Sequence, residues 1–196
     1  MYIHIHKSPI KYIEIRDFVE PAQLARWAKQ LAKLPTAPGD VVTPTGAYTV
    51  NAVKRNSNAW LTPPNTVADE FRQLAWSKDV KEAIADMGDY LFLAHSTVDE
   101  GSFLYSEYVQ GQYYEWHRDR TPYLTYNLVV ESAEEGGHFE MSTSTSEPYQ
   151  ITEQVANTAN TLLIFPSFLM HRVKPIIKGR RRTLQYFLNA SHVASQ

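Results

Sequence analysis

The sequence contains no cysteine, and this absence narrows the chemistry available to the chain. Without thiols there are no disulfides, no thiolate metal sites and no cysteine nucleophile. Any bound metal would therefore use His, Asp or Glu as ligands. The net charge is also small: its formal value is −2, and the pI is about 6.4. No overall basic field attracts nucleic acid.

Long apolar runs are missing as well. No segment reaches the roughly 20 apolar residues of a membrane-spanning helix, and the N-terminus lacks the basic and apolar segments of a secretory signal peptide. We therefore expect a cytoplasmic protein. The 196 residues, 43% hydrophobic and 20% charged, suit one globular domain with a sizeable core.

Hydrophobic periodicity predicts one or two strands and then mainly helices in the first half of the chain. Residues 1–19 alternate between apolar and polar side chains and predict one or two strands. A helix should begin at Pro21, and two more are expected near Val67–Trp76 and Val80–Tyr90. Between the first two helices, residues 35–65 are rich in Pro, Gly, Thr and Asn and predict a long loop or an irregular hairpin.

One segment of this loop, Val53–Trp60, mixes basic, amide and aromatic side chains. Long loops in compact domains are often functional, so this segment suits contact with a substrate. An exposed loop anchored by Trp60 explains the same composition equally well.

From Gly101 onward the chain consists of short β-rich runs separated by turn residues. Helices followed by many short strands predict an α+β fold, mainly β: an antiparallel barrel or jelly roll with N-terminal helices packed on its outer face. One domain is expected over residues 1–196, with helical support to about residue 100 and the β core over about 101–190. The predicted strands are Phe103–Val109, Tyr123–Val130, His138–Met141, Tyr149–Thr152, Thr161–Phe165, Leu169–Val173 and Thr183–Asn189.

His117 and Asp119 stand two residues apart, so both side chains leave the same face of a β-strand. A histidine and a carboxylate on one face supply two ligands of a facial triad, in which two histidines and one carboxylate hold a ferrous ion and leave positions open. The pair alone is weak evidence, because a surface ion pair or a core histidine can have this spacing. His4 and His6 are spaced as a metal pair too, although a solvent-facing strand explains them better.

The third ligand should be a histidine farther along the chain. His171 ends an apolar run that begins at Leu162, and buried flanks would hold an imidazole in a fixed direction; an ordinary core histidine fits this position as well. His138 has ligand spacing with Glu140, but it follows a tight turn and is interpreted as the start of an edge strand. His192 lies in a polar tail and is a poor candidate.

A basic cluster follows at residues 179–183, where Lys-Gly signals a turn and three arginines begin the next strand. By strand parity Arg181 and Thr183 share one face. An arginine beside a hydroxyl, on the strand next to a metal ligand, would hold a dicarboxylate through a bidentate fork. A solvated basic patch is the alternative, and we prefer it for Arg180 and Arg182.

Taken together, these residues resemble the iron(II)- and 2-oxoglutarate-dependent dioxygenases, particularly the prolyl 4-hydroxylase-like branch. The resemblance covers roughly Tyr108 to Leu188. The motifs that carry it are Tyr108-x-x-Gly111-x-x-Tyr114-x-x-His117-x-Asp119, the pair Gly136-Gly137, the run Asn160–Ser167 leading into His171, and Gly179 with Arg181.

The resemblance implies a double-stranded β-helix that uses Fe(II), O2 and 2-oxoglutarate. The implied reaction hydroxylates a C–H bond and releases succinate and CO2, and this branch suggests a peptidyl residue such as proline as the target. By the same resemblance, the Fe(II) ligands are His117, Asp119 and His171, the 2-oxoglutarate anchor is Arg181 with help from Tyr108 and Thr183, and Tyr114 lines the substrate side.

Two positions depart from the family pattern. The paired glycines run into His138-Phe139, where the family more often has an acidic residue and an aliphatic one. Phe187 stands where many members carry a tryptophan that touches substrate. Both departures concern the substrate rather than the iron chemistry, so a free amino acid or another small molecule stays open.

Two other functions fit the same scaffold less well. A nucleic-acid demethylase would have a basic stripe and a second arginine on the final strand, and Thr183–Tyr186 supplies none. A non-catalytic jelly-roll module would have been favoured by loss of a triad residue or of Arg181, and all four are present.

Overall fold

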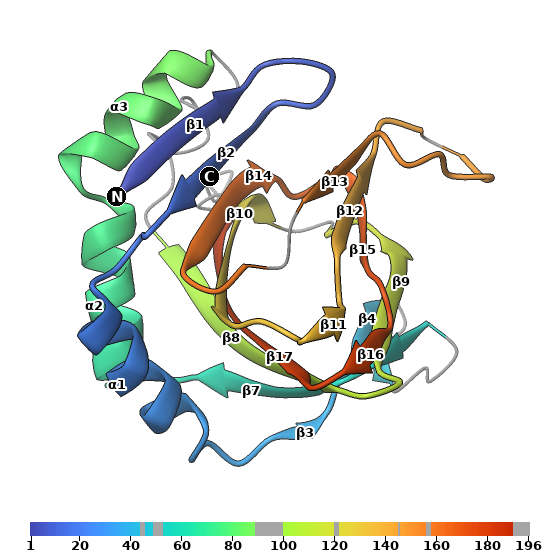
Figure 1. Cartoon of the computed structure of the whole chain (residues 1–196), viewed down its shortest axis with the longest axis horizontal. Helices are drawn as coiled ribbons and strands as arrows, with labels where there is room; N and C mark the ends of the chain where they lie inside the picture. The colour runs from blue at the N-terminus through green and yellow to red at the C-terminus, as the bar shows by residue number, and fades with distance from the viewer. Residues whose placement is uncertain are drawn as a thin grey trace, which may run out of the picture.

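Two antiparallel sheets form the body of the fold and enclose its interior, with the helices along one side (Figure 1). The computed structural model describes residues 1–43, 46–48, 53–88, 100–119, 122–144, 146–155 and 158–189. The larger sheet has the order β1 (Tyr2–His6), β2 (Tyr12–Arg16), β14 (Thr161–Pro166), β10 (Pro122–Glu131), β17 (Arg180–Asn189), β8 (Glu100–Val109), β7 (Ser57–Leu61) and β3 (Ala37–Pro38). The smaller sheet has the order β13 (Glu153–Val155), β12 (Phe139–Ser142), β15 (Met170–Val173), β9 (Tyr113–His117) and β6 (Lys54–Arg55).

Two short ladders lie beside these sheets. One pairs β11 (Glu135–Gly136) with β16 (Ile176–Lys178), and the other pairs β4 (Val41–Thr43) with β5 (Gly46–Tyr48). This mainly β architecture confirms the predicted jelly roll.

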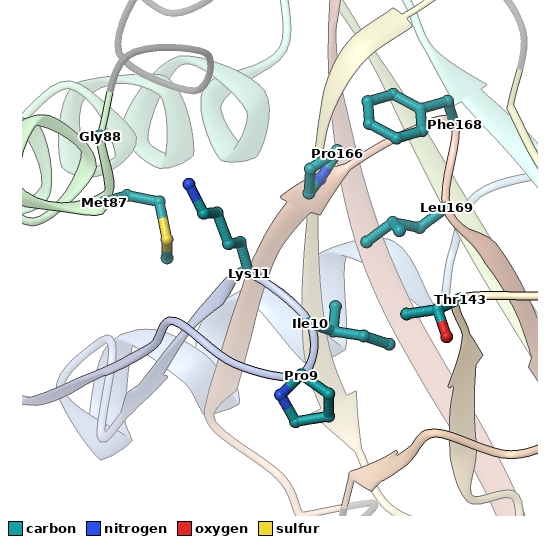
Figure 2. Close-up of a pocket in the computed structure, with 9 residues that line it drawn as sticks. All are labelled: Pro9, Ile10, Lys11, Met87, Gly88, Thr143, Pro166, Phe168 and Leu169. Carbon is teal, nitrogen blue, oxygen red and sulfur yellow. The ribbon is translucent and has the colours of Figure 1, made fainter.

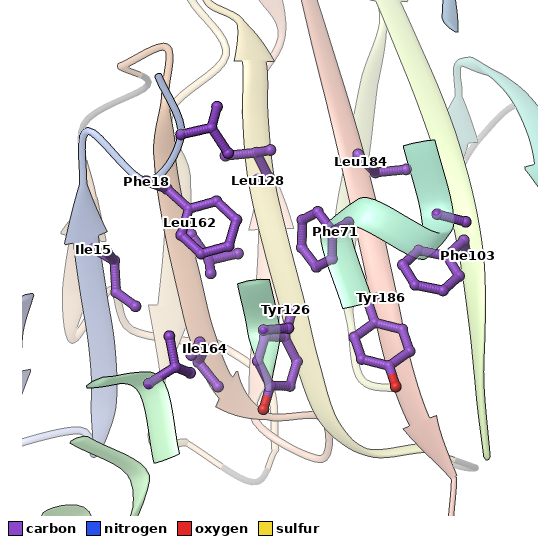
Figure 3. Packing of buried hydrophobic residues seen from close by; sticks show 14 of the residues in the cluster. Ile15, Phe18, Phe71, Phe103, Tyr126, Leu128, Leu162, Ile164, Leu184 and Tyr186 are labelled. Carbon is purple, nitrogen blue, oxygen red and sulfur yellow. The ribbon is translucent and has the colours of Figure 1, made fainter. Parts of the chain in front are cut away.

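Three helices cover the outer face of the larger sheet: α1 (Pro21–Leu31), α2 (Thr66–Ala75) and α3 (Lys78–Met87). Phe71 of α2 is central to the interface, with its ring centroid 5.8 Å from that of Phe103 and 6.1 Å from that of Tyr186 (Figure 3). Tyr186 of β17 is therefore buried beneath the helices. Among the described helices, none has the length and apolar character needed to cross a membrane.

The N-terminal half contributes more strands than its composition predicted. The alternation over residues 1–19 is confirmed by β1 and β2. Residues 35–65, expected as a long loop or an irregular hairpin, contain five short strands in their described part, and two of these, β4 and β5, pair with each other. Of the five, β7 extends the larger sheet and β6 the smaller one. Such short strands are stabilised by pairing with β8 and β9 rather than by local propensity, so their own sequence shows little sign of them.

The predicted strand at Tyr149–Thr152 was wrong, since the strand at this point is β13 at Glu153–Val155. Its position is set by pairing with β12, in which Phe139 lies opposite Val155. The helix expected to end at Tyr90 is described only as far as Met87, and its predicted end lies outside the described residues.

Asn160 ties the N-terminal segment to the barrel. Its side-chain oxygen accepts a hydrogen bond from Val19 N at 3.0 Å, and its amide donates to Val19 O at 2.7 Å. Its φ is +61°, a conformation that asparagine tolerates better than most residues. The polypeptide between β2 and α1 is thereby fixed to the start of β14.

Glu70 joins α2 to α1 and should make stability depend on acid pH. Its carboxylate accepts hydrogen bonds from the Arg26 guanidinium and, at 2.7 Å, from the buried Trp27 indole, and these bonds lower the pKa of Glu70 below 4.5. A carboxyl with a lowered folded-state pKa contributes stability that is complete above its unfolded pKa and is lost as pH falls through the folded one. We expect Glu70→Gln to cost about 1 kcal/mol at pH 7 and progressively less as pH falls through the folded-state pKa of Glu70, as measured by urea unfolding. A cost that does not change with pH would contradict this.

Candidate active site

Three predicted metal ligands meet at one end of the smaller sheet. His117 ends β9 and lies opposite His171 of the neighbouring strand β15. Asp119 lies two residues beyond the end of β9, not within a strand as predicted, and its backbone N–H donates to Ser167 O at 2.9 Å. One ligand atom from each of the three side chains lies within 4.8 Å of the others, and His171 Nε2 is 3.8 Å from Asp119 Oδ2.

Both histidines are oriented by backbone carbonyls. His117 Nδ1 lies 2.8 Å from Glu115 O, and His171 Nδ1 lies 2.8 Å from Leu169 O. Because a carbonyl oxygen can only accept, each Nδ1 carries a proton, and the hydrogen bond fixes the direction in which Nε2 points. Burial, aided by His171, lowers the pKa of His117 well below its usual value, so this imidazole is neutral and able to bind a cation.

Asp119 is held by two residues that the sequence did not single out as site residues. Thr125 Oγ1 donates to Asp119 Oδ2 at 3.4 Å and lies 2.8 Å from Ser167 Oγ, while the Ser167 carbonyl holds the Asp119 backbone. Burial raises the pKa of Asp119, although His171, Lys54 and the Thr125 hydrogen bond oppose that rise. A divalent cation would further favour the ionised carboxylate.

Thr125→Val should weaken metal binding without disturbing the fold. The substitution keeps the shape of this buried side chain but removes the hydrogen bond to Asp119, and loss of such a supporting group typically costs ten- to a hundredfold in metal affinity. Since the bond is long, we expect about a tenfold loss of Fe(II) affinity, measured anaerobically by competition with a chromophoric chelator. The matched Thr183→Val variant should keep wild-type Fe(II) affinity; an equal loss in both would contradict a specific role for Thr125.

The predicted co-substrate anchor, Arg181, is a buried residue of β17 in the larger sheet. Arg181 is 1% exposed and lies opposite Tyr108 on β8, with its guanidinium carbon 5.8 Å from the Tyr108 ring centroid. Burial lowers the pKa of Arg181 to about 10 and raises that of Tyr108 to about 12, so at neutral pH one is charged and the other is not. Thr183 Oγ1 is buried without a hydrogen-bond partner among the described residues. A buried cation beside an unpaired hydroxyl fits the carboxylate of a polar ligand.

Tyr114 covers one of the predicted ligands. Its ring stacks on His117 with centroids 3.4 Å apart and an interplanar angle of 12°. Lys54 belongs to β6, the other strand that pairs with β9, and its Nζ lies 4.7 Å from the Tyr114 ring centroid. From the sequence, Lys54 could be assigned only to the segment Val53–Trp60. In a strand of two residues, the face to which each side chain points cannot be predicted until the pairing strand is known. Trp60, the residue expected to anchor an exposed loop, is 59% exposed and its ring centroid lies 6.3 Å from that of Phe187.

None of the competing metal candidates that the structure describes belongs to a group of three possible ligands. His138 is exposed, and Glu140 is occupied by Arg172 at 2.6 Å. His6 stacks on Tyr12 and does not join a cluster of three ligands; over the described residues, His117, Asp119 and His171 form the one such cluster. The candidate His192 lies outside the described residues.

Arg180 and Arg182 are paired rather than forming a free basic patch. Arg180 Nε lies 2.9 Å from Glu131, and Arg182 bonds both Glu107, at 2.6 Å, and Glu131, at 3.0 Å. These pairs neutralise the positive charge of the outer face, so the prediction of a solvated cluster was wrong in this respect. Arg181, between them in sequence, points into the barrel.

A separate cavity of 260 Å³ opens beside the β1–β2 hairpin (Figure 2). Its lining is mostly apolar and contains none of the predicted ligands. It borders the β14–β15 turn through Phe168 and Leu169, so it is a neighbour of the metal cluster rather than part of it. The remaining lining residues are Pro9, Ile10, Lys11, Met87, Gly88, Thr143 and Pro166.

Residues 103–189, which contain this entire cluster, match the 2OG-Fe(II) oxygenase superfamily. Among solved structures, a Pseudomonas putida prolyl-4-hydroxylase is similar in fold, with a TM-score of 0.69 and 18% identity over 93% of this chain and 94% of that one. A Trichoplax adhaerens prolyl hydroxylase in complex with a hypoxia inducible factor peptide fragment has a TM-score of 0.70 and 16% identity, covering 94% and 87%.

A viral collagen prolyl hydroxylase from Paramecium Bursaria Chlorella virus-1, in a 2OG complex, gives a TM-score of 0.63 and 16% identity over 92% and 96% of the two chains. No curated protein sequence matches this chain. At such low identities the structural likeness establishes the fold, while the chemistry has to be argued from the side chains.

Proposed function

Because residues 103–189 make this chain a member of the 2OG-Fe(II) oxygenase superfamily, we propose that it hydroxylates a C–H bond of a peptidyl residue such as proline. The chain is a 2-oxoglutarate-dependent dioxygenase, and Fe(II), 2-oxoglutarate and O2 are its cofactor and co-substrates. Succinate and CO2 are the proposed by-products.

One observation carries the assignment of residues: two imidazole nitrogens and one carboxylate oxygen lie within 4.8 Å of one another, and the charge of that carboxylate acts on Tyr108, whose ring lies beside the buried Arg181. Such a donor set fits Fe(II), with positions left open on its other side. Dioxygen activation and decarboxylation of the oxo acid are the chemistry that the iron supplies when bound. In this proposal His117, Asp119 and His171 hold the metal.

The protein's own contribution is binding and orientation. Arg181, with Tyr108 and the unpaired Thr183 hydroxyl, would bind the distal carboxylate of 2-oxoglutarate, since charge-assisted hydrogen bonds are strong in a buried site. Tyr114, fixed against His117, would form the wall that positions the target C–H bond. The peptide target is supported by the peptide complex of the Trichoplax structural neighbour.

The first test is anaerobic. Fe(II) and 2-oxoglutarate added to the apoprotein should produce the weak visible charge-transfer band of the chelate, and admission of O2 with a proline-containing peptide should yield succinate and a hydroxylated product seen by mass spectrometry. A folded protein that forms no band would overturn the catalytic assignment. A band accompanied by product only from free amino acids would overturn the peptide target alone.

A further inference from the structure

A buried lysine next to the predicted iron site indicates which substrate group the site recognises. We infer that Lys54 binds a carboxylate of the substrate, close to the carbon that is oxidised. This inference rests on the proposed function and deepens it, because it assigns a specificity-determining residue outside the matched region 103–189.

Lys54 reaches the site from the strand next to the ligand strand. It lies opposite Tyr114 in the β6–β9 pair, and Glu115 N donates to Val53 O at 2.8 Å beside it. Its ammonium nitrogen is 4.7 Å from the Tyr114 ring centroid, and its charge acts on Asp119 and on His117. The ammonium therefore lies within electrostatic reach of the predicted iron ligands.

The side chain is buried and closely packed. Lys54 is 7% exposed, whereas lysines are almost never fully buried unless they are paired. Gly39 packs against it and against Asn56: a β-carbon there would lie 2.0 Å from Asn56 Oδ1 and 2.9 Å from Lys54 Cε. The lysine stem is therefore in close contact with the backbone of Gly39.

The groups in contact with this ammonium are neutral. Lys54 Nζ donates to Asp40 O at 3.2 Å, faces the Tyr114 ring, and lies 3.1 Å from the Asn58 amide oxygen in the orientation that satisfies both atoms of that amide. Asp119 and the Asp40 carboxylate attract it from farther away, and the described residues place no carboxylate within ion-pair distance of it. A buried cation with neutral partners favours an anionic ligand.

The sum of the charges in the site with Fe(II) and 2-oxoglutarate bound also favours an anionic substrate group. The two positive charges of Fe(II) and the one of Arg181 are matched by the negative charge of Asp119 and the two of 2-oxoglutarate. Both histidines are neutral in this arrangement. One buried positive charge remains, on Lys54, and a single substrate carboxylate would neutralise it.

Two sources could supply that carboxylate: an acidic residue beside the target residue of a peptide, or the α-carboxylate of a free amino acid. The probes are acetyl-Ala-Pro-Asp-amide, the neutral acetyl-Ala-Pro-Ala-amide and free L-proline. Their binding is measured by isothermal titration calorimetry to the protein loaded with redox-inert Zn(II) and 2-oxoglutarate, so the readout does not depend on turnover.

We expect at least one carboxylate-bearing probe to bind about tenfold or more tightly than the neutral peptide, and Lys54→Met to abolish that preference while 2-oxoglutarate affinity is unchanged. Lys54→Arg should keep part of the preference. The matched control is Lys81→Met, which removes an exposed lysine that also lies over an aromatic ring, that of Trp76, outside this site; it should bind all probes like the wild type.

A neutral peptide that binds as tightly as both acidic probes, or failure of both acidic probes to bind, would overturn the inference. So would a Lys54→Met variant that loses 2-oxoglutarate affinity, because Lys54 would then serve the co-substrate. Each of these results differs from failure of the proposed function, which would appear as absence of the Fe(II)–2-oxoglutarate band in the wild type.

Discussion

Replacing His117 with alanine should reduce 2-oxoglutarate turnover to the level of a protein-free control. The imidazole occupies a fixed direction, set by its Nδ1 bond to Glu115 O, and the ring stacks against Tyr114. Alanine removes one of three donors, and two remaining ligands cannot hold Fe(II) in the facial geometry that leaves open positions for 2-oxoglutarate and O2. His171→Ala should behave in the same way, since His171 faces His117 across the β9–β15 pair. Succinate release, measured with and without a peptide, gives the readout.

The chain offers a close control in His138. It directly precedes β12 of the smaller sheet, has ligand-like spacing to Glu140, and is exposed. His138→Ala should keep full turnover and the visible band. All three variants should melt as cooperatively as wild type without metal, and Fe(II) should raise the melting temperature of His138→Ala only, because a ligand stabilises only the folded protein that binds it. Undiminished turnover in His117→Ala would disprove the ligand assignment.

The second large effect is expected for Arg181→Met, which removes the buried cation but keeps a side chain of similar length. We expect KM for 2-oxoglutarate to rise by about a hundredfold, close to 3 kcal/mol, which is the worth of a buried, charge-assisted carboxylate interaction. Fe(II) affinity should remain at the wild-type value, because the guanidinium lies with Tyr108 and Thr183 rather than among the metal ligands. Steady-state kinetics with varied 2-oxoglutarate measures the change.

A discriminating control uses a different oxo acid. 2-Oxobutyrate lacks the distal carboxylate, so the variant should lose little activity toward it relative to wild type, and the preference between the two oxo acids should collapse. Arg182→Met, one residue away but paired with Glu107 and Glu131, should leave KM unchanged. Equal losses for both oxo acids would mean that Arg181 supports the fold rather than the co-substrate.

The β core was predictable because its strands carry strong local signals. Residues 162–166 are all apolar and the strand is buried on both faces, and strand parity correctly placed Arg181 and Thr183 on one face. Paired glycines marked the turn before β12 for a physical reason. At Gly136 φ is +82° and a β-carbon would lie 2.4 Å from Pro175 O, so only glycine fits.

The supporting residues of the site were not predictable from the sequence. Thr125 lies on β10 of the larger sheet, whereas Asp119 follows β9 of the smaller one, and Lys54 meets Tyr114 only through the β6–β9 pairing, so both contacts depend on the arrangement of the strands. Asp119 itself lies beyond its strand, so strand periodicity explains its spacing from His117 only in part. That the whole chain forms one domain stays a prediction.

The β14–β15 connection has a consequence for how the metal site tolerates change. Ser167 fixes the Asp119 backbone, and His171 follows only four residues later, so this short turn sets the spacing between two proposed ligands. Inserting or deleting one residue between them would move His171 to the opposite face of its strand while β14 stayed in register with β10. The length of this turn therefore helps to define the metal site: a change in length would leave a folded barrel in which the three ligands no longer meet, so Fe(II) would not bind.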